Sequence, residues 1–309
     1  MEFAIRYSLD TLPFKPRGRV VALGLFDGIH EGHIAIIRDT VRKAAAAGLT
    51  SCVQTFINIP KSETGELTTP EEKLSILSSL GVEELLVLDY NEVRDMSPED
   101  FIMDCLLVRM GAAQVVVGAD YRFGKGAAGD VDLLKSVCSS LDIDVHVHEE
   151  MLEDGRKVSS TWLKELLLNG EVDKYARFCK GRFFSYTGKV VVGKQMGHLM
   201  GFPTANIEIP ESKIVIKRGV YASRVTLGKR VLYGVTNVGL RPTLENTTRD
   251  VCETYIFDFD EDIYGAVITV EPVAHIRAET RFDSKEQLMA QVEADKVSAR
   301  AIISEVFGE

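Results

Sequence analysis

The stretch RVVALGLFDGIHEGH, Arg19 to His33, decides the fold of the first half of the chain. An apolar, β-rich run passes directly into a glycine-rich turn, and the helical pattern that follows ends near Gly48. Similar β-rich runs alternate with helical patterns as far as about Met151. Alternation of this kind predicts a parallel sheet with crossover helices, so we expect the first domain to be α/β.

Local signals agree with these helices. Thr69 precedes Pro70 and is followed three residues on by Glu72, as in a capping box, and Gly48 suits the residue after a helix. Another helix is predicted from Pro98. Residues 159 to 180 are typical of two short helices broken at Asn169-Gly170, after which the pattern changes.

The second half is rich in β segments separated by Gly, Pro and Asn turns, from Phe183 to about Ile276. This pattern predicts an antiparallel barrel or sandwich. A closing helix is expected from Ser284, with Gln287 as its capping-box partner, nearly to Gly308. At 309 residues the chain is about twice a usual domain of roughly 150 residues. We therefore predict two domains, 1–181 and 182–309.

Composition narrows the class of protein. Hydrophobic residues make up 45% and charged residues 27%, as in ordinary globular proteins. The net charge of −10 and the scattered basic residues argue against nucleic-acid binding. No signal-peptide pattern and no apolar run of membrane-spanning length occurs, so we expect a cytoplasmic protein without a membrane partner. Five cysteines without a CxxC pair are expected to be buried, reduced thiols: Cys52, Cys105, Cys138, Cys179 and Cys252. The oligomeric state stays open.

The segment GLFDGIHEGH, Gly24 to His33, lies where the first strand gives way to the first long helix. Loops at strand ends are where α/β sheets bind ligands. Glycines let the backbone approach a phosphate, and a helix amino terminus offers unpaired N–H groups. His30 and His33 can add hydrogen bonds to phosphate oxygens, which would stabilise charge at an α-phosphate during in-line displacement.

The pattern FDGxHxGH after an apolar strand resembles the nucleotidyltransferase signature, and the segment is similar to that of prokaryotic FAD synthetases. Four further matches follow in the family's order: LTTPEEK (67–73), SPEDFI (97–102), VVVGADYRFGKGAAGD (115–130) and VSST (158–161). The resemblance implies a nucleotidyltransferase-type parallel sheet that transfers an adenylyl group from ATP to FMN, giving FAD and pyrophosphate. It implies His30 and His33 as catalytic residues. The implied nucleotide-binding residues are Gly24, Phe26, Asp27, Gly28, Gly32, Asp120, Arg122, Ser159, Ser160, Thr161 and Lys164.

Two departures from that family pattern are evident. The usual TFDPHP is TFINIP here, so Ile57 and Ile59 replace Asp and His near the expected flavin contact. The usual SSTRIR is SSTWLK, which puts Trp162 and Lys164 where arginines are expected. Because lysine cannot reproduce a bidentate phosphate contact, we expect weak or altered adenylyl transfer.

The segment GKQMGHLMGFPTANI, residues 193–207, resembles the riboflavin kinase motif along nearly its full length. Its glycines permit a phosphate-binding loop. Thr204 and Asn206 supply oxygen ligands suited to a Mg²⁺ ion that bridges ATP phosphates. The nucleotide-binding residues implied for the kinase are Gly193, Gly197, Gly201, Pro203, Thr204 and Asn206.

Four more segments follow in riboflavin kinase order: RGVYAS (218–223), NVGLRPT (237–243), CETYIFDFDEDIYG (252–265) and HIRAETRFDS (275–284). Glu253 matches the family's catalytic base, and Arg277 matches an arginine near the closing helix that binds flavin. A surface ion pair is an equal alternative for Arg277. His146 and His148 could chelate a metal, but no third ligand is suitably spaced, which favours a polar strand face.

We therefore predict a bifunctional enzyme that makes FMN from riboflavin in a β-barrel kinase domain and FAD from FMN in the first domain. Both steps are expected to use ATP and Mg²⁺. The runner-up is a kinase whose first domain has become structural or regulatory. A flavin sensor without turnover is a further alternative, although sensing alone would not require Glu253.

Overall fold

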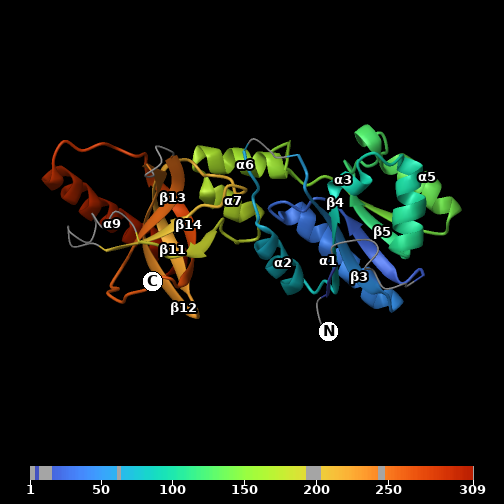
Figure 1. Ribbon diagram of the computed structural model, residues 1–309, viewed down its shortest axis with the longest axis horizontal. Coiled ribbons are helices and arrows are strands. Elements are labelled where there is room, and N and C mark those ends of the chain that lie inside the picture. The colour runs from blue at the N-terminus through green and yellow to red at the C-terminus, as the bar shows by residue number, and fades with distance from the viewer. Residues whose placement is uncertain (1–3, 7–15, 61–63, 193–202, 243–247, 309) are drawn as a thin grey trace. The chain divides into compact units, whose positions relative to one another are not determined.

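The computed structural model describes residues 4–6, 16–60, 64–192, 203–242 and 248–308. The chain divides into two compact units, Met1–Ser160 and Thr161–Glu309. The first holds a sheet between helices, and the second holds a strongly curved sheet with a long helix on its outside (Figure 1). The predicted fold class is confirmed in both halves.

The first unit is built on a six-stranded parallel sheet with the order β1-β4-β3-β2-β5-β6. The edge strand β1 was not expected from the sequence. The strands are β1 (Ala4–Arg6), β2 (Arg19–Leu23), β3 (Thr50–Ile57), β4 (Glu84–Asp89), β5 (Ala112–Gly118) and β6 (Asp144–His148). A short hairpin, β7 (Leu152–Glu153) and β8 (Arg156–Lys157), follows the sheet.

Both faces of this sheet are buried, as near-continuous apolar strands require. In β2, Val20 and Ala22 pack on the face covered by α1 (Glu31–Ala47) and α2 (Pro70–Ser79). Val21 and Leu23 pack on the other face. The segments that cover that second face are α3 (Tyr90–Val93), the π-helix Phe101–Arg109 and α5 (Val131–Ser140).

The expected helix ends are confirmed. Thr69 and Glu72 form the reciprocal hydrogen bonds of a capping box at α2. Gly48 ends α1 with φ +66, in the left-handed conformation that glycine adopts without strain. The helix expected from Pro98 begins as one turn, α4 (Pro98–Asp100), and continues as the π-helix, which no sequence signal indicated.

The second unit contains a six-stranded antiparallel sheet with the order β10-β13-β12-β11-β14-β9. An isolated bridge between Val191 and Asn206 joins its two ends, so the sheet nearly closes into a barrel. The strands are β9 (Tyr186–Lys189), β10 (Thr204–Glu208), β11 (Gly219–Leu227), β12 (Arg230–Pro242), β13 (Thr248–Ile256) and β14 (Val267–Arg277).

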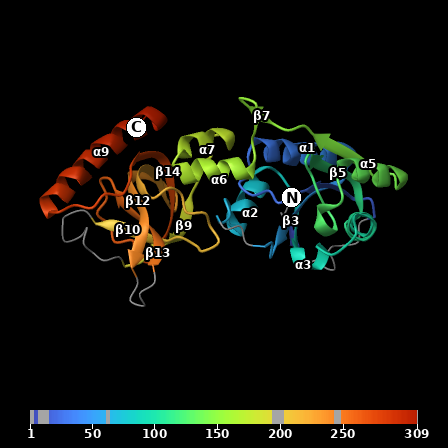
Figure 2. The same cartoon turned by 90° about the horizontal axis from the view of Figure 1, so that it is seen from above.

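In the part of the second unit that the structure describes, three helices accompany this barrel. The predicted pair is α6 (Ser160–Asn169) and α7 (Val172–Phe178). The closing helix α9 (Lys285–Phe307) lies along the outside of the barrel (Figure 2). The expected Ser284 cap is confirmed, but the Gln287 side chain accepts from the backbone N–H of Asp283 instead of that of Ser284.

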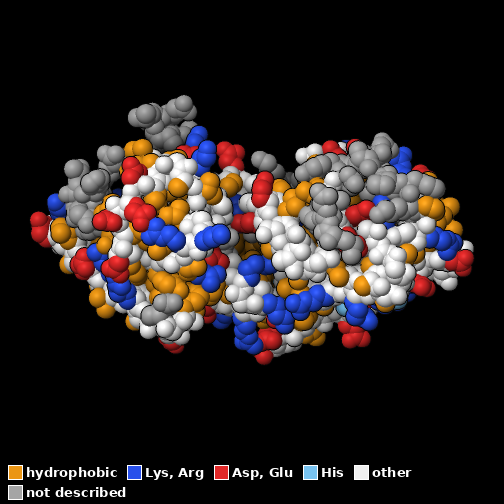
Figure 3. Space-filling model, turned by 90° about the horizontal axis from the view of Figure 1, so that it is seen from below, with side chains coloured by type: hydrophobic (Ala, Val, Ile, Leu, Met, Phe, Trp, Pro, Cys, Tyr) orange, Lys and Arg blue, Asp and Glu red, His pale blue; other side chains and the backbone are white. Residues whose placement is uncertain are grey.

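Buried and exposed side chains agree with a globular protein. All five cysteines are buried, and none is in a disulfide within the described residues. The face drawn in Figure 3 carries both basic and acidic side chains. Among the residues that the structure describes, no helix has the length and apolar character needed to cross a membrane.

Candidate active sites

The first candidate site lies at the carboxyl ends of β2 and β5. The chain leaves β2 toward β3 on one side and leaves β5 toward β6 on the other, so the strand order reverses between these neighbours. Such a switch point is where open parallel sheets bind ligands. The histidine loop, residues 24–30, follows β2, and the loop carrying Asp120 follows β5.

The histidine loop has an unusual backbone. Phe26, Gly28 and Ile29 have φ values of +49, +79 and +40. Left-handed conformations are uncommon for non-glycine residues and are held by surrounding structure, often at functional sites. His30 then begins α1 as its N-cap, with Glu31 in the first turn. The loop thus brings the amino terminus of a 17-residue helix to the sheet edge.

His30 is held as a neutral hydrogen-bond donor. Its side chain is 6% exposed, and burial lowers its pKa to about 4, with the Lys157 charge adding to the effect. Nδ1 accepts a 3.4 Å hydrogen bond from the His33 backbone N–H. The single proton of the neutral ring is therefore on Nε2.

His33 packs directly on His30, with ring centroids 3.8 Å apart. Burial lowers the pKa of His33 well below its usual value, and its Nδ1 is buried without a hydrogen-bond partner in the described residues. A Cβ at Gly32 would lie 3.2 Å from the His30 ring, which explains the glycine between the histidines. Phe26 is buried and packs on the His33 ring in a T-shaped contact, with ring centroids 5.3 Å apart.

A charged cluster lies beside the histidines. Lys157 is hydrogen-bonded to Asp120 and, at 2.8 Å, to Glu150. Its charge lowers the pKa of both His30 and His33, whereas Asp120 opposes this effect on His30. Sequence reasoning missed Lys157, because a lone lysine two residues before SST carries no signal of its own.

Of the remaining predicted nucleotide contacts, the structure joins Ser160 directly to this site. The Ser160 hydroxyl donates a 2.8 Å hydrogen bond to the Asp27 carbonyl, which joins the SST segment to the histidine loop. Arg122 pairs at 3.5 Å with Asp130, the N-cap of α5, and both side chains are largely exposed. Thr161 and Lys164 follow in α6, which packs with the second unit.

The second candidate site lies on three adjacent strands of the barrel. The Thr204 hydroxyl of β10 donates a 2.6 Å hydrogen bond to Glu253 Oε1 of β13. Asn206 is directly opposite Glu253 in the register, and its amide donates to the Thr204 carbonyl and hydroxyl oxygens at 3.2 and 3.3 Å. The sheet thus brings together three of the residues that the sequence predicted for the kinase, namely Thr204, Asn206 and Glu253. Gly193, Gly197 and Gly201 lie outside the described residues.

A fourth residue, Asn237 of β12, was missed by sequence reasoning. It is opposite Glu253 on the other side, so directly paired side chains place Asn206, Glu253 and Asn237 on one face of the sheet. Asn237 also donates a 3.4 Å hydrogen bond to Glu279. Only the strand register could reveal this residue, because Asn237 and Glu253 are in different segments of the sequence.

A cavity of about 300 Å³ opens beside Thr204. Its walls come from β10, the end of β13 and the loop before β14. The lining residues are Val190, Pro203, Thr204, Ala205, Ile256, Phe259, Asp260, Glu261, Asp262, Ile263 and Tyr264. The predicted Pro203 and Thr204 therefore line a mixed apolar and acidic cavity adjacent to Glu253.

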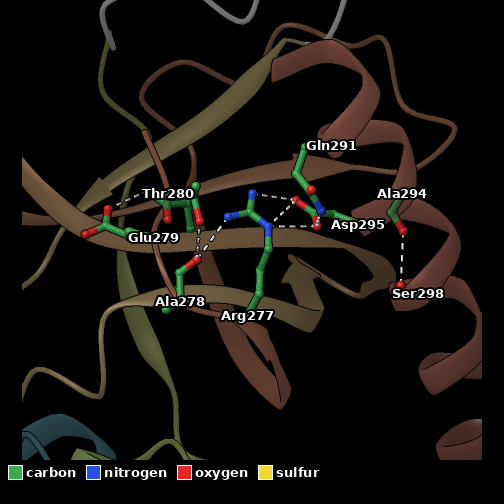
Figure 4. A network of polar contacts seen from close by, with 9 residues as sticks. Arg277, Ala278, Glu279, Thr280, Gln291, Ala294, Asp295 and Ser298 are labelled. Atoms are coloured by element: carbon green, nitrogen blue, oxygen red, sulfur yellow. Dashed lines mark hydrogen bonds and ion pairs between the residues drawn. The ribbon is translucent and has the colours of Figure 1, made fainter. Parts of the chain in front are cut away.

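Arg277, predicted to bind flavin, makes a bidentate ion pair with Asp295 of α9 (Figure 4). The distances are 2.9 Å from Nε to Oδ1 and 2.7 Å from Nη2 to Oδ2. Gln291 donates to the same carboxylate, and Nη1 of Arg277 donates to the Ala278 carbonyl. Asp295 is 3% exposed, so this ion pair is largely buried, unlike the surface pair considered from the sequence, and it fastens α9 to the end of β14.

The histidines of β6 have separate partners. His146 Nε2 lies 3.2 Å from Gln114 Oε1, and His148 Nε2 lies 3.1 Å from Asp39 Oδ2. No group of three His, Cys, Asp or Glu side chains suited to a metal occurs in the described parts of the chain. Each of these histidines is thus hydrogen-bonded to its own neighbour.

Comparisons with known proteins assign both units. The FAD synthetase family model matches residues 13–162, and the riboflavin kinase model matches residues 180–303. The chain is 35% identical over 292 residues to a bifunctional riboflavin kinase/FMN adenylyltransferase of Bacillus subtilis, with 91% of each chain covered. It is 33% identical over 299 residues to the protein of the same name in Escherichia coli, covering 94% of this chain and 93% of that one.

The chain belongs to the bifunctional riboflavin kinase/FMN adenylyltransferase family. A solved structure titled as a macrolide-efflux protein from Streptococcus pneumoniae is also similar, with a TM-score of 0.85 and 28% identity over 97% of this chain and 99% of that one. Because both family models match, a kinase with a degenerate first domain is not favoured.

The structure places the two departures from the family pattern. Ile57 is exposed and Ile59 half-buried at the end of β3, which adjoins β2. The Trp162 ring packs on Phe178 of α7 with centroids 4.7 Å apart. Trp162 therefore serves packing in the second unit, where an arginine would have offered a charge.

Proposed function

We propose that the barrel unit transfers the γ-phosphoryl group of ATP to riboflavin and that the parallel-sheet unit transfers the adenylyl group of a second ATP to FMN. The observation that supports this best is the contact between Thr204 and Glu253, which aligns a carboxylate with a small oxygen ligand beside a cavity. We propose residues 1–181 and 182–309 as the two functional segments, with the SSTWLK segment of α6 belonging to the first.

In the kinase step, Glu253 would accept the proton of the ribityl 5′-hydroxyl as that oxygen attacks the γ-phosphorus. The hydrogen bond from Thr204 keeps one carboxylate oxygen oriented. The side-chain oxygen atoms of Thr204 and Asn206, beside a carboxylate, are suitable ligands for a hard cation such as Mg²⁺. When bound, Mg²⁺ would neutralise charge on the ATP phosphates.

In the adenylyl step, the FMN phosphate would attack the α-phosphorus of ATP and pyrophosphate would leave. His30 would donate Nε2–H to an α-phosphate oxygen, because its Nδ1 is already an acceptor. A neutral donor suits this role, since the ring needs no proton from solvent and its orientation is set by the helix. Besides burial, the Lys157 charge lowers the pKa of His30 and so favours the neutral ring that this role requires.

The small-molecule partners are riboflavin, FMN and ATP. Buried, reduced thiols support the cytoplasmic location expected from the sequence.

The experiment that tests this proposal is a time course with pure protein, riboflavin, ATP and Mg²⁺, followed by chromatographic separation of the three flavins. FMN followed by FAD is the expected result. A His30→Asn variant retains a good N-cap residue and should make FMN while slowing FAD formation by about 10²-fold. FMN without FAD in the unaltered protein would leave a kinase alone, and no new flavin would favour the sensor.

A further inference from the structure

The segment Leu67–Lys73, LTTPEEK, is hydrogen-bonded to the histidine loop at both of its ends. Asp27 Oδ1 accepts from the backbone N–H groups of Leu67 and Thr68 at 2.9 and 3.1 Å. The loop therefore uses one of its own acidic side chains to fix the start of this segment. This carboxylate oxygen points toward the segment's backbone.

Thr68 makes the return contact. Its hydroxyl accepts a 3.2 Å hydrogen bond from the Gly28 N–H and donates at 3.3 Å to Asp27 Oδ1. The side chain is 4% exposed, so water cannot easily replace either bond. One hydroxyl thus fixes both the acidic residue and the left-handed glycine of the loop.

Lys73, at the other end of the segment, also hydrogen-bonds to the histidine loop. Its ammonium donates to the Leu25 carbonyl at 2.8 Å and to the Thr55 hydroxyl at 3.2 Å. The Thr55 hydroxyl in turn donates to the Leu25 carbonyl at 2.8 Å. Burial lowers the pKa of Lys73, and the charges of Asp27 and Glu66 oppose this effect.

These contacts hold a strained backbone conformation in place. Left-handed φ at Phe26 and Ile29 is strained, because a Cβ disfavours this backbone conformation. A loop with such strain would relax if its surroundings did not hold it. The histidine pair begins immediately after the strained residues, so a relaxed loop would move His30 and the helix amino terminus together.

We propose that Thr68 and Lys73 are positioning residues for adenylyl transfer, which hold the histidine loop in its left-handed conformation. This inference rests on the proposed function of the first unit. It assigns LTTPEEK a bracing role, and it assigns Asp27 Oδ1 to the brace instead of the nucleotide. Displacement of a catalytic group by about 1 Å can cost about 10²-fold in rate.

The test compares Thr68→Val, which keeps the side-chain shape and loses the hydroxyl, with Thr68→Ser, which restores the hydroxyl. Lys73→Gln is a second, milder variant, and Ser75→Ala on the exposed side of α2 is the matched control. FAD formation from supplied FMN and the kinase reaction are measured in each full-length protein. Hydrogen exchange of residues 24–30 reports the loop directly.

We expect Thr68→Val and Lys73→Gln to lower kcat for FAD formation about 10- to 100-fold with little change in KM for ATP. Kinase turnover should be unchanged, the loop amides should exchange faster, and Thr68→Ser should recover most of the rate. If the Thr68→Val and Lys73→Gln variants kept the wild-type hydrogen-exchange rates and the wild-type kcat, the proposal would be wrong. A rise in KM for ATP without a change in kcat would also overturn it, because these residues would then be substrate ligands. If the unaltered protein formed no FAD, the proposed function would fail, and hydrogen exchange would still decide the brace.

Discussion

Thr204 Oγ1 donates a 2.6 Å hydrogen bond to Glu253 Oε1 although the two residues are 49 positions apart. Antiparallel pairing of β10 with β13 creates this contact, and pairing of β13 with β12 adds Asn237 on the far side of Glu253. Glu253 therefore lies between two neighbouring strands, and Thr204 orients its carboxylate. A rigid sheet is a precise support for a proton-accepting group.

Glu253→Gln should lower kcat for riboflavin phosphorylation by about 10² to 10⁴, because the amide cannot accept the hydroxyl proton. The Thr204 hydroxyl can still donate to the amide oxygen, so the fold should be kept. FAD formation from supplied FMN should be unchanged in the same variant. Separate assays of the two steps check this, and undiminished phosphorylation would remove Glu253 as the base.

Thr204→Val should raise the Mg²⁺ concentration required for half-maximal kinase activity by about tenfold, since an oxygen ligand is lost without a change in shape. Titration of activity with Mg²⁺ after chelation measures the shift. Thr187→Val removes an exposed threonine of β9 that pairs with Thr269, and it serves as the control. Equal Mg²⁺ dependence in the two variants would contradict a ligand role for Thr204.

His30 should remain neutral at every pH above about 5, because burial lowers its pKa to about 4. In the unfolded chain the His30 ring has a pKa near 6.5. Between about pH 4 and pH 6.5 the unfolded chain therefore binds this proton more readily than the folded chain does. Stability of the first unit should be complete above pH 6.5 and fall by about 3 kcal/mol as the pH approaches 4. NMR titration, with His30→Asn for assignment, measures the pKa, and a midpoint near 6.5 would refute the buried neutral ring.

Asp295→Ala should destabilise the second unit by about 3 kcal/mol, because it leaves the Arg277 guanidinium without its buried partner. The double change Arg277→Met with Asp295→Leu should recover most of that loss, since no charge remains unpaired. Urea unfolding followed by the fluorescence of Trp162, the single tryptophan, reports this unit. A loss below about 0.5 kcal/mol in Asp295→Ala would show that the pair does not anchor α9.

Much of the fold follows from local sequence. The capping box at Thr69, the left-handed Gly48 and the break at Asn169-Gly170 each depend on a few adjacent residues, and each was predicted. The π-helix Phe101–Arg109 was not predicted. A change from i→i+4 to i→i+5 hydrogen bonds leaves no distinctive pattern of residues in the sequence. The three-residue edge strand β1 is too short to show a period.

The candidate site residues divide in the same way. The residues His30, His33, Thr204 and Glu253 belong to recognisable motifs, and the structure places them at two sites. Asn237 begins the segment NVGLRPT but was not singled out within it, and Lys157 belongs to no motif; both are revealed by their neighbours. The partner of Arg277 is a residue of the last helix, which no spacing rule could identify.

By itself, the sequence determined the two fold classes, the helix ends and the residue types that carry the chemistry, because these depend on period, capping and short motifs. The tertiary structure alone decided which of those residues meet. Strand register joins Thr204 to Glu253, the brace from Thr68 and Lys73 sets the strained histidine loop, and burial makes His30 neutral. Contacts between distant segments and the removal of water from a side chain arise only when the whole chain has packed.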